Sequence, residues 1–230
     1  FAKLKLCYNY FMKTKQQTIC LCAFLTFFVI FFVLALLVIF NNNWLITTDN
    51  NVASFFANNR QPFFNYLFVI ASFVGQTATI AVLCLILLLL PNRKNLGIPV
   101  AIITITSALL NFLIKIVVAR ARPDGYFLTT NVLGYKMPTG YSFPSGHAQT
   151  ASVFYISTAI FTLKYLKKDW QTILLLTLAI ALCFVICFAR IYLAVHFLSD
   201  VLAGLSLGLF VVFAGIFMAQ HISPKVLNIY

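Results

Sequence analysis

Residues 18–40 read TICLCAFLTFFVIFFVLALLVIF, an apolar run that contains no charged side chain. Roughly 20 consecutive apolar residues are enough for a helix to cross the hydrocarbon core of a bilayer. The run is too long for the apolar part of a signal peptide, and no small-residue cleavage site precedes Asn41. It therefore predicts a retained membrane-spanning helix, and with it an integral membrane protein.

The rest of the chain has the same apolar character. Of the 230 residues, 62% are hydrophobic and 9% are charged, whereas soluble domains are nearer half apolar and a quarter charged. Because a helix satisfies its own backbone hydrogen bonds in lipid, each further apolar run is predicted to be helical. We predict an all-α membrane bundle that forms one domain over residues 1–230, with a cytoplasmic tail at 1–17. The six spans are predicted at 18–40, 66–90, 98–118, 148–163, 172–189 and 201–219.

Residues 41–63 join the first two predicted spans. Within them, Val52, Phe55, Phe56 and Asn59 recur at helical spacing. This spacing predicts a short amphipathic helix that lies on the membrane surface. An irregular loop with a few buried phenylalanines is the alternative.

The basic residues indicate the orientation, because Lys and Arg are enriched in cytoplasmic loops. Six spans place both termini on one side, and that side carries Lys3, Lys5, Lys13, Lys15, Arg93, Lys94, Lys164, Lys167, Lys168 and Lys225. The other side carries Arg60, Lys115, Arg120, Arg122, Lys136 and Arg190. The excess on the first side predicts cytoplasmic termini. Abundant Phe, Asn, Ile and Lys is typical of an AT-rich genome, so we expect the cytoplasmic (inner) membrane of a bacterium.

Other features of the composition have simple interpretations. The net charge of +12 does not indicate a nucleic-acid partner, because the basic residues fall into short loops between spans. The six cysteines lie in or beside apolar segments and are predicted to be small buried hydrophobic residues. The chain begins with Phe1, and Met12, which starts a short basic stretch before the first span, is predicted to be the natural translation start.

Most of the charged side chains that remain near the membrane gather in three segments. Residues 115–123 read KIVVARARP, residues 144–147 read PSGH, and residues 190–200 read RIYLAVHFLSD. Charges are costly in this environment, so those that are kept are candidate functional groups. The predicted topology puts all three segments at the outer face, as a single shared site requires.

The first segment offers two cations. Lys115 and Arg122 lie seven residues apart, about two helical turns, so they can share a face. Two fixed cations suit a dianionic phosphate, and Arg can bind it through two parallel hydrogen bonds. Alternatively, the two side chains only anchor a helix end at the membrane interface.

The second segment precedes an apolar run and predicts a helix N-terminus. Gly146 allows close approach of the backbone, and free N–H groups at such a terminus attract an anion. Ser145 adds a hydroxyl donor, and His147 is placed to give a proton to a leaving oxygen. The alternative is a helix cap with an incidental histidine.

The third segment contains a histidine and a carboxylate at helical spacing. His196 and Asp200 lie four residues apart, hence on one helical face. A carboxylate bonded to one ring nitrogen fixes the tautomer and leaves the other nitrogen free to attack. Arg190 is close enough in sequence to hold the phosphate that is attacked. The alternative is a buried His–Asp pair that serves packing, although Asp200 is one of only four acidic residues.

In order and spacing, the three segments resemble the signature of the type 2 phosphatidic acid phosphatase (PAP2) superfamily, K-x6-RP, PSGH and SR-x5-H-x3-D. The resemblance implies a membrane phosphatase that uses no metal ion and no cofactor. The sequence departs from the signature at Ala189, where the family usually has Ser before Arg190. A lost hydroxyl removes one hydrogen bond of about 1 kcal/mol, so we expect weakened or redistributed phosphate binding and retained activity.

The resemblance also implies a role for each matched residue. His196 is expected to be the nucleophile that forms a phosphohistidine, Asp200 its orienting partner, and His147 the general acid. The residues expected to bind phosphate are Lys115, Arg122, Ser145, Gly146 and Arg190. Arg120 matches no motif position and is interpreted as a peripheral anchor or an interfacial contact. Four scattered acidic residues leave no carboxylate cluster for magnesium.

The predicted activity is hydrolysis of a phosphomonoester or diphosphate on a membrane lipid at the outer face. The candidate substrates are undecaprenyl diphosphate, phosphatidylglycerol phosphate, phosphatidic acid and a lipid A phosphate. A lipid-linked phosphotransferase that uses the same histidine is the alternative, and it differs only in the acceptor. A transporter is less well supported, because its charged residues should be spread through the membrane depth.

Overall fold

The computed structural model describes residues 2–128, 131–166 and 168–222, and within these ranges every regular element is helical. This agrees with the all-α prediction. The elements are α1 (Ala2–Ile39), α2 (Asn43–Asn58), α3 (Pro62–Val74), α4 (Thr77–Leu89), α5 (Gly97–Val118), α6 (Gly146–Ala151), the π-helical turn η1 (Ser152–Ile156), α7 (Ser157–Thr162), the 3-10 turn η2 (Leu163–Tyr165), α8 (Asp169–Tyr192) and α9 (Leu198–Ile222).

Four of the described helices are long and apolar enough to cross a membrane. They are Gln17–Ile39 of α1, Gly97–Val118, Asp169–Tyr192 and Leu198–Ala219 of α9, and each coincides with a predicted span. The pair α3 and α4 is a fifth candidate if it counts as one span. The helical stretch formed by α6, η1 and α7 is not among these candidates, so the sixth span stays a prediction.

The predicted span at 66–90 is not one straight helix. It is divided into α3 and α4, which are bent by 47° relative to each other. The break falls at Gly75, where a Cβ would overlap the Ile186 side chain of α8, so glycine allows this close approach. Thr79 Oγ1 donates to the carbonyl of Phe73 (2.7 Å) and satisfies one acceptor at the break. On the N-terminal side of this bend, α3 packs against α8.

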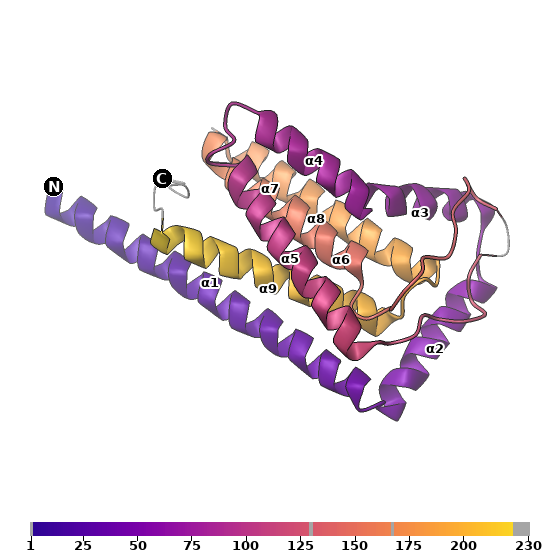
Figure 1. Ribbon diagram of the computed structural model, residues 1–230. Coiled ribbons are helices and arrows are strands. Elements are labelled where there is room, and N and C mark those ends of the chain that lie inside the picture. Colours follow the sequence, from indigo (N-terminus) through magenta and orange to yellow (C-terminus); the bar gives the residue numbers. More distant parts are fainter. Residues whose placement is uncertain (1, 129–130, 167, 223–230) are drawn as a thin grey trace.

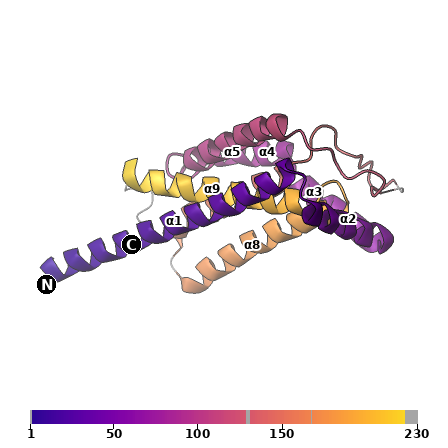
Figure 2. The same ribbon diagram turned by 90° about the horizontal axis from the view of Figure 1, so that it is seen from below.

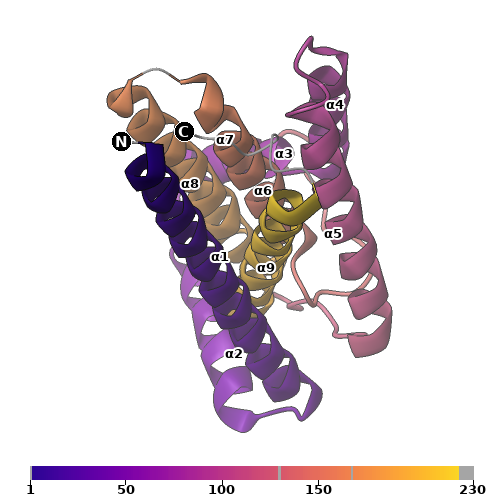
Figure 3. The ribbon, with the colours of Figure 1, turned by 90° about the vertical axis from the view of Figure 1, so that its left-hand side faces the viewer.

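Helix α9 lies at the centre of the bundle, between α1 on one side and α5, α6 and α8 on the others (Figures 2 and 3). Small residues make this possible. A Cβ at Gly204 would overlap the carbonyl oxygen of Ser145, and one at Gly208 would overlap Ser152 Oγ. Glycines four residues apart let two helices approach closely where no hydrophobic force drives their association. They bring α9 against the start of α6.

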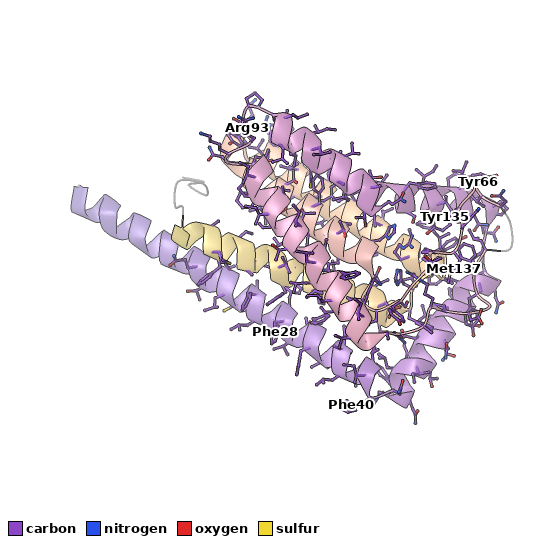
Figure 4. The ribbon with its side chains drawn as sticks, viewed as in Figure 1. Phe28, Phe40, Tyr66, Arg93, Tyr135 and Met137 are labelled. Atoms are coloured by element: carbon purple, nitrogen blue, oxygen red, sulfur yellow. The ribbon has the colours of Figure 1, made fainter. Side chains whose placement is uncertain are left out.

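Large apolar side chains on the outward face of α1 are exposed, among them Phe28, and so is Phe40 directly after the helix (Figure 4). In water such a surface is unfavourable, but lipid tails are as apolar as these side chains. The exposed apolar face of α1 is therefore the face expected of a helix in an integral membrane protein.

The helix predicted between the first two spans is found at α2, so the irregular-loop alternative is wrong. Asn42 caps it by accepting a hydrogen bond from Leu45 N (3.1 Å). Its buried face is formed by Leu45, Asp49 and Ala53 and packs against α8 and α9. The location of α2 on the membrane surface stays a prediction, and the burial of a carboxylate on it was not anticipated.

The connections between helices fall at two ends of the bundle. The α4–α5 connection, where Arg93 lies, is at the end that also holds the start of α1 and the α7–α8 connection (Figures 1 and 4). Tyr135 and Met137, in the long α5–α6 connection, lie at the opposite end. The α4–α5 and α7–α8 connections therefore lie at one end of the bundle, and the long α5–α6 connection lies at the other.

We expect Gly204→Ala to destabilise the protein, because the added Cβ would meet the fixed Ser145 backbone. Overpacking of this kind costs about 1–3 kcal/mol, so the thermal unfolding midpoint in detergent should fall. Gly215→Ala is the matched control in the same helix, because the nearest atoms to its Cβ belong to the Ile103 side chain and not to backbone. Equal midpoints for the two variants would contradict the close approach of α9 to Ser145.

Candidate active site

The structure brings the three polar segments together at the end of the bundle that holds the α5–α6 and α8–α9 connections (Figure 1). Ser145 N, just before α6, donates to the carbonyl of Asp200 on α9 (2.9 Å). Arg122 Nη1, in the α5–α6 connection, donates to the carbonyl of Val195 (2.7 Å). Segments far apart in the sequence therefore share one polar region at the edge of an apolar bundle.

His196 lies between α8 and α9, and its side chain is almost fully buried. Its Nδ1 lies 3.2 Å from Ser142 Oγ, and the Ser142 hydroxyl donates to Asp200 Oδ2. The direct distance from Nδ1 to Asp200 Oδ2 is 3.6 Å, too long for a good hydrogen bond. The expected direct contact between ring and carboxylate is therefore replaced by a bridge through Ser142, because this hydroxyl lies between them.

This bridge defines which ring nitrogen is available. Ser142 donates its one proton to Asp200, so it can only accept from His196, and Nδ1 must then carry the ring proton. The Nε2 nitrogen keeps its lone pair and lies 3.1 Å from Arg122 Nη1. This unprotonated nitrogen therefore accepts from a guanidinium, and an anionic group bound to that guanidinium would lie beside the ring.

The surroundings of His196 also keep the ring neutral. Burial lowers the pKa of the imidazole well below its usual value of 6.5, and the charges of Arg190, Arg122 and Lys115 lower it further. A neutral imidazole has a lone pair for attack, whereas an imidazolium has none. The three cations are called the cationic cluster below.

Two members of the cationic cluster hold the end of the α5–α6 connection. Lys115 Nζ donates to the carbonyls of Tyr141 (2.7 Å) and Ser142 (3.2 Å). Arg122 Nε donates to the carbonyl of Gly140 (3.0 Å). Lys115 is thus turned inward, and the alternative of a simple interfacial anchor does not describe it. An anionic phosphate is a stronger acceptor than these neutral carbonyls.

The third member, Arg190 on α8, is completely buried. Its Nη1 donates to Tyr135 Oη (2.5 Å) and to the hydroxyl of Ser72 on α3. Within the described part of the chain, its Nε and Nη2 have no hydrogen-bond partner. Unpaired donors on a buried charge are strongly unfavourable, and each needs a physical reason. Two free donors on one planar guanidinium match two oxygens of a phosphate.

The second segment begins α6 as predicted. Ser145 is the N-cap and accepts from Ala148 N at 3.5 Å, so its fully buried hydroxyl faces the helix backbone. Ser145 is thus a helix cap, and its role in phosphate binding stays a prediction. Gly146 and His147 follow as the first two helical residues, and His147 is partly exposed. The charges of Arg190 and His196 are close enough to interact with His147.

The interpretation of Arg120 as a peripheral anchor is wrong. Its Nη1 pairs with Asp200 Oδ1 (2.7 Å) and its Nη2 with Asp49 Oδ2 (2.8 Å). Its guanidinium also lies over the Phe197 ring, 4.3 Å from the centroid. Arg120 is therefore a central contact of the site, which spacing alone did not reveal because both partners lie far away in the sequence.

Four residues of the site were missed by sequence reasoning: Asp49, Ser72, Tyr135 and Ser142. Only Asp49 carried a usable signal, since it is one of four acidic residues and sits on the predicted amphipathic helix. The hydroxyl groups of the other three do not stand out among the many Ser and Tyr residues of the chain. Ser72 and Tyr135 supply hydroxyls that accept from Arg190. Arg190 directly follows Ala189, the position at which the family usually has Ser.

A buried network of polar side chains joins α5 and α6 next to the site. Asn111 Nδ2 on α5 donates to Gln149 Oε1 on α6 (2.5 Å), and Gln149 Nε2 donates to Ser107 Oγ (2.7 Å). These groups lie between apolar helices, where each unsatisfied donor would be costly. The network therefore fixes α6 against α5, one turn from Lys115.

Among the described residues, no three His, Cys, Asp or Glu side chains are grouped so that they could hold a metal ion.

Comparisons with known proteins agree with this geometry. A family model described as the PAP2 superfamily matches residues 95–222. The chain is 31% identical to an undecaprenyl-diphosphatase of Sulfolobus acidocaldarius, over 66% of this chain and 69% of that protein. It is 30% identical to phosphatidylglycerophosphatase B of Bacillus subtilis, over 67% of this chain and 74% of that protein.

Solved structures show the same fold. The transmembrane PAP2 type phosphatidylglycerolphosphate phosphatase from Bacillus subtilis superposes with a TM-score of 0.78 and 26% sequence identity. This match covers 88% of the present chain and 98% of that one. Aquifex aeolicus LpxE superposes with a TM-score of 0.56 and 23% identity, over 72% of this chain and 93% of that one. The second likeness concerns the fold alone.

We expect Ser142→Ala to lower kcat for phosphate release by about tenfold or more, with little change in KM. A hydrogen bond to a charged group contributes about 1.5–3 kcal/mol, and about 1.4 kcal/mol is a factor of ten in rate. Ser157→Ala is the control, because that buried hydroxyl bonds only to carbonyls of its own helical stretch. Equal kcat values for the two variants would show that the bridge does not matter.

Proposed function

The chain belongs to the PAP2 superfamily and is a phosphoric monoester or diphosphate hydrolase of the membrane, and from this premise we propose that it dephosphorylates a lipid phosphate through a phosphohistidine at His196. One observation carries the proposal. His196 is neutral and buried, its Nδ1 is held by Ser142, and its Nε2 faces Arg122. That arrangement is what a nitrogen nucleophile needs in front of a bound phosphate.

In the first step, His196 Nε2 attacks the phosphorus atom and the bond to the leaving oxygen breaks. The cationic cluster offsets the negative charge that the phosphoryl oxygens carry, which is the main catalytic task in phosphoryl transfer. The two free donors of Arg190 bind two of these oxygens. Burial and the neighbouring cations lower the pKa of His147 in the empty site. The bound phosphate dianion offsets these cations and favours protonation of His147, which then donates its proton to the leaving oxygen.

In the second step, water attacks the phosphohistidine. His147, now without its proton, accepts a proton from that water, and the N–P bond breaks to release inorganic phosphate. His196 returns to its neutral state with Nδ1–H still directed to Ser142. Each residue ends in the form in which it began, so the cycle needs no metal ion and no cofactor.

The named relatives support a lipid diphosphate or a phospholipid phosphate as the substrate. One relative is an undecaprenyl-diphosphatase and another a phosphatidylglycerophosphatase. We place undecaprenyl diphosphate and phosphatidylglycerol phosphate first among the candidates, followed by phosphatidic acid and a lipid A phosphate.

The proposed orientation puts the site at the outer face of a bacterial cytoplasmic membrane, with six spans and cytoplasmic termini. Arg93 and the basic α4–α5 connection lie at the end of the bundle opposite the long α5–α6 connection, which supports this orientation (Figure 4). The exposed Trp44 on α2 and the exposed Phe40 that precedes it would then lie at the outer interface, where aromatic side chains are favoured.

The direct test is release of inorganic phosphate by the purified protein from each of the four candidate lipids in detergent. We expect turnover with at least one lipid and undiminished turnover in EDTA. His196→Ala should abolish turnover while the protein stays folded. Phosphate release by His196→Ala would overturn the nucleophile, loss of activity in EDTA would contradict the metal-free cycle, and no turnover by wild type would reject the proposed function.

A pH profile tests the ionisation of His196. Its pKa in the folded protein is lowered, so the ring stays neutral down to a pH well below 6.5 and loses nucleophilicity only there. We expect the acid limb of kcat/KM that belongs to His196 to have its midpoint below pH 6.5. If the limb belongs to His196, its midpoint is the same with phosphatidic acid and with undecaprenyl diphosphate as the substrate. If the limb instead reports ionisation of the substrate, its midpoint differs between the two lipids. A shared midpoint at or above 6.5 would contradict the proposal.

A further inference from the structure

Arg120 connects carboxylates of two helices that are far apart in the sequence. One side of its guanidinium pairs with Asp49 on α2, and the other pairs with Asp200 on α9. Asp49 also accepts from the backbone N–H (3.0 Å) and the hydroxyl of Ser199. The start of α9 is therefore fixed to α2 immediately beside the orienting carboxylate. We call Asp49, Arg120 and Asp200 the charge triad.

The charge triad is buried. Asp200 is fully inaccessible, the side chain of Asp49 is 2% exposed, and that of Arg120 is 14% exposed. A carboxylate in such surroundings is strongly destabilising unless a cation and further hydrogen bonds are present. Arg120 provides this cation for both carboxylates at once, so neither carboxylate is independent of the other.

The two oxygens of Asp200 have separate tasks. Oδ1 pairs with Arg120, whereas Oδ2 accepts from Ser142 Oγ and from the backbone N–H of Phe197 (2.9 Å). Only Oδ2 lies toward the His196 ring. Fixing Oδ1 therefore prevents rotation of the carboxylate, and the position of Oδ2 sets the bridge to the nucleophile. Arg120 contacts no ring atom of His196 in any of these interactions.

We propose that Arg120 and Asp49 are positioning residues for His196, and that α2 is thereby part of the catalytic apparatus. Arg120 holds Asp200 in the orientation that supports the bridge through Ser142, and it balances the charge of Asp200 so that the ring stays neutral. Asp49 holds Arg120. The catalytic consequence rests on the proposed function, whereas the effect on the His196 ring does not.

The charged groups around His196 come from every neighbouring element. They are Lys115 of α5, Arg122 of the α5–α6 connection, His147 of α6, Arg190 of α8 and Asp200 of α9. Removing Arg120 leaves the negative charge of Asp200 unbalanced beside the ring, which favours the imidazolium. Removing the charge of Asp49 leaves Arg120 to act on Asp200 alone, which has the opposite effect. A role in packing alone predicts no such pair of opposite signs.

The first experiment measures the His196 ring without any substrate. The chain has three histidines, His147, His196 and His221, so 15N-histidine NMR in detergent gives one pair of ring-nitrogen signals for each of them, and single His→Gln variants assign the pairs. In wild type we expect the Nδ1–H tautomer. The pKa of His196 should be higher by about 1 in Arg120→Gln and lower than in wild type in Asp49→Asn.

Matched controls are available. Asp124→Asn makes the same carboxylate-to-amide change on an exposed side chain of the α5–α6 connection, and Arg93→Gln makes the same change on an exposed arginine at the opposite end. Neither should alter the His196 signal. If Arg120→Gln does not fold, Arg120→Lys keeps the charge but has no fork to reach both carboxylates, and Asp49→Asn remains an isosteric test.

The second experiment measures turnover of the lipid that wild type hydrolyses best. We expect kcat to fall about 100-fold in Arg120→Gln and about tenfold in Asp49→Asn, with KM within about threefold, because neither residue belongs to the cationic cluster. The double variant should be no slower than Arg120→Gln, since Asp49 acts through Arg120.

The outcomes separate the two proposals. If wild type hydrolyses no lipid phosphate, the proposed function fails, and the NMR titration still decides the role of the charge triad. Folded variants with the wild-type His196 titration and the kcat of their controls would overturn the positioning role. Additive losses in the double variant would show that Asp49 does not act through Arg120.

Discussion

A buried carboxylate, Asp200, is the constraint on which the site depends. It lies inside an apolar bundle and must be matched on every side, because an unpaired charge there is strongly unfavourable. Its Oδ1 pairs with Arg120, its Oδ2 accepts from Ser142, and its backbone carbonyl accepts from Ser145 N. The requirement to satisfy one residue therefore joins the α5–α6 connection, the start of α6 and the start of α9, while Arg120 extends the connection to α2.

Such a polar centre can exist in an apolar protein only if the helices around it approach closely. Gly204 and Gly208 let α9 pack directly against the segment that starts α6. Asn111 and Gln149 then satisfy each other between α5 and α6, below the site. The glycine contacts of α9 and the Asn111–Gln149 hydrogen bond both fix the backbone near His147. The helices that carry the side chains of the site are therefore held in place, and these side chains stay within hydrogen-bond distance of one another.

Which features of the fold and the site can be predicted from the sequence depends on how far apart in the sequence the contacting residues lie. The spans at residues 18–40 and 201–219 follow from unbroken apolar runs, and the meeting of the three polar segments follows from the cost of charge in a membrane. The bend at Gly75 was not predictable, because it results from contact with Ile186 in another helix. The bridge through Ser142 and the pairing of Arg120 with Asp49 depend on contacts of long sequence separation that involve common residue types. Spacing predicts neighbours on one helix, not across several.

Under the proposed mechanism, the charge triad also explains why a cationic site can hold His196 as a neutral nucleophile. Each ion pair of the described residues involves Asp49 or Asp200, and none of these pairs includes Lys115, Arg122 or Arg190. If Asp200 were not balanced by Arg120, its charge would stabilise an imidazolium at His196 and would oppose a phosphate dianion. With Arg120 in place, the charge of the carboxylate is paired while its other oxygen holds the ring through Ser142. In the proposed mechanism the cationic cluster, whose partners in this structure include neutral carbonyls, binds the phosphoryl oxygens, and the two free donors of the buried Arg190 take part in this binding.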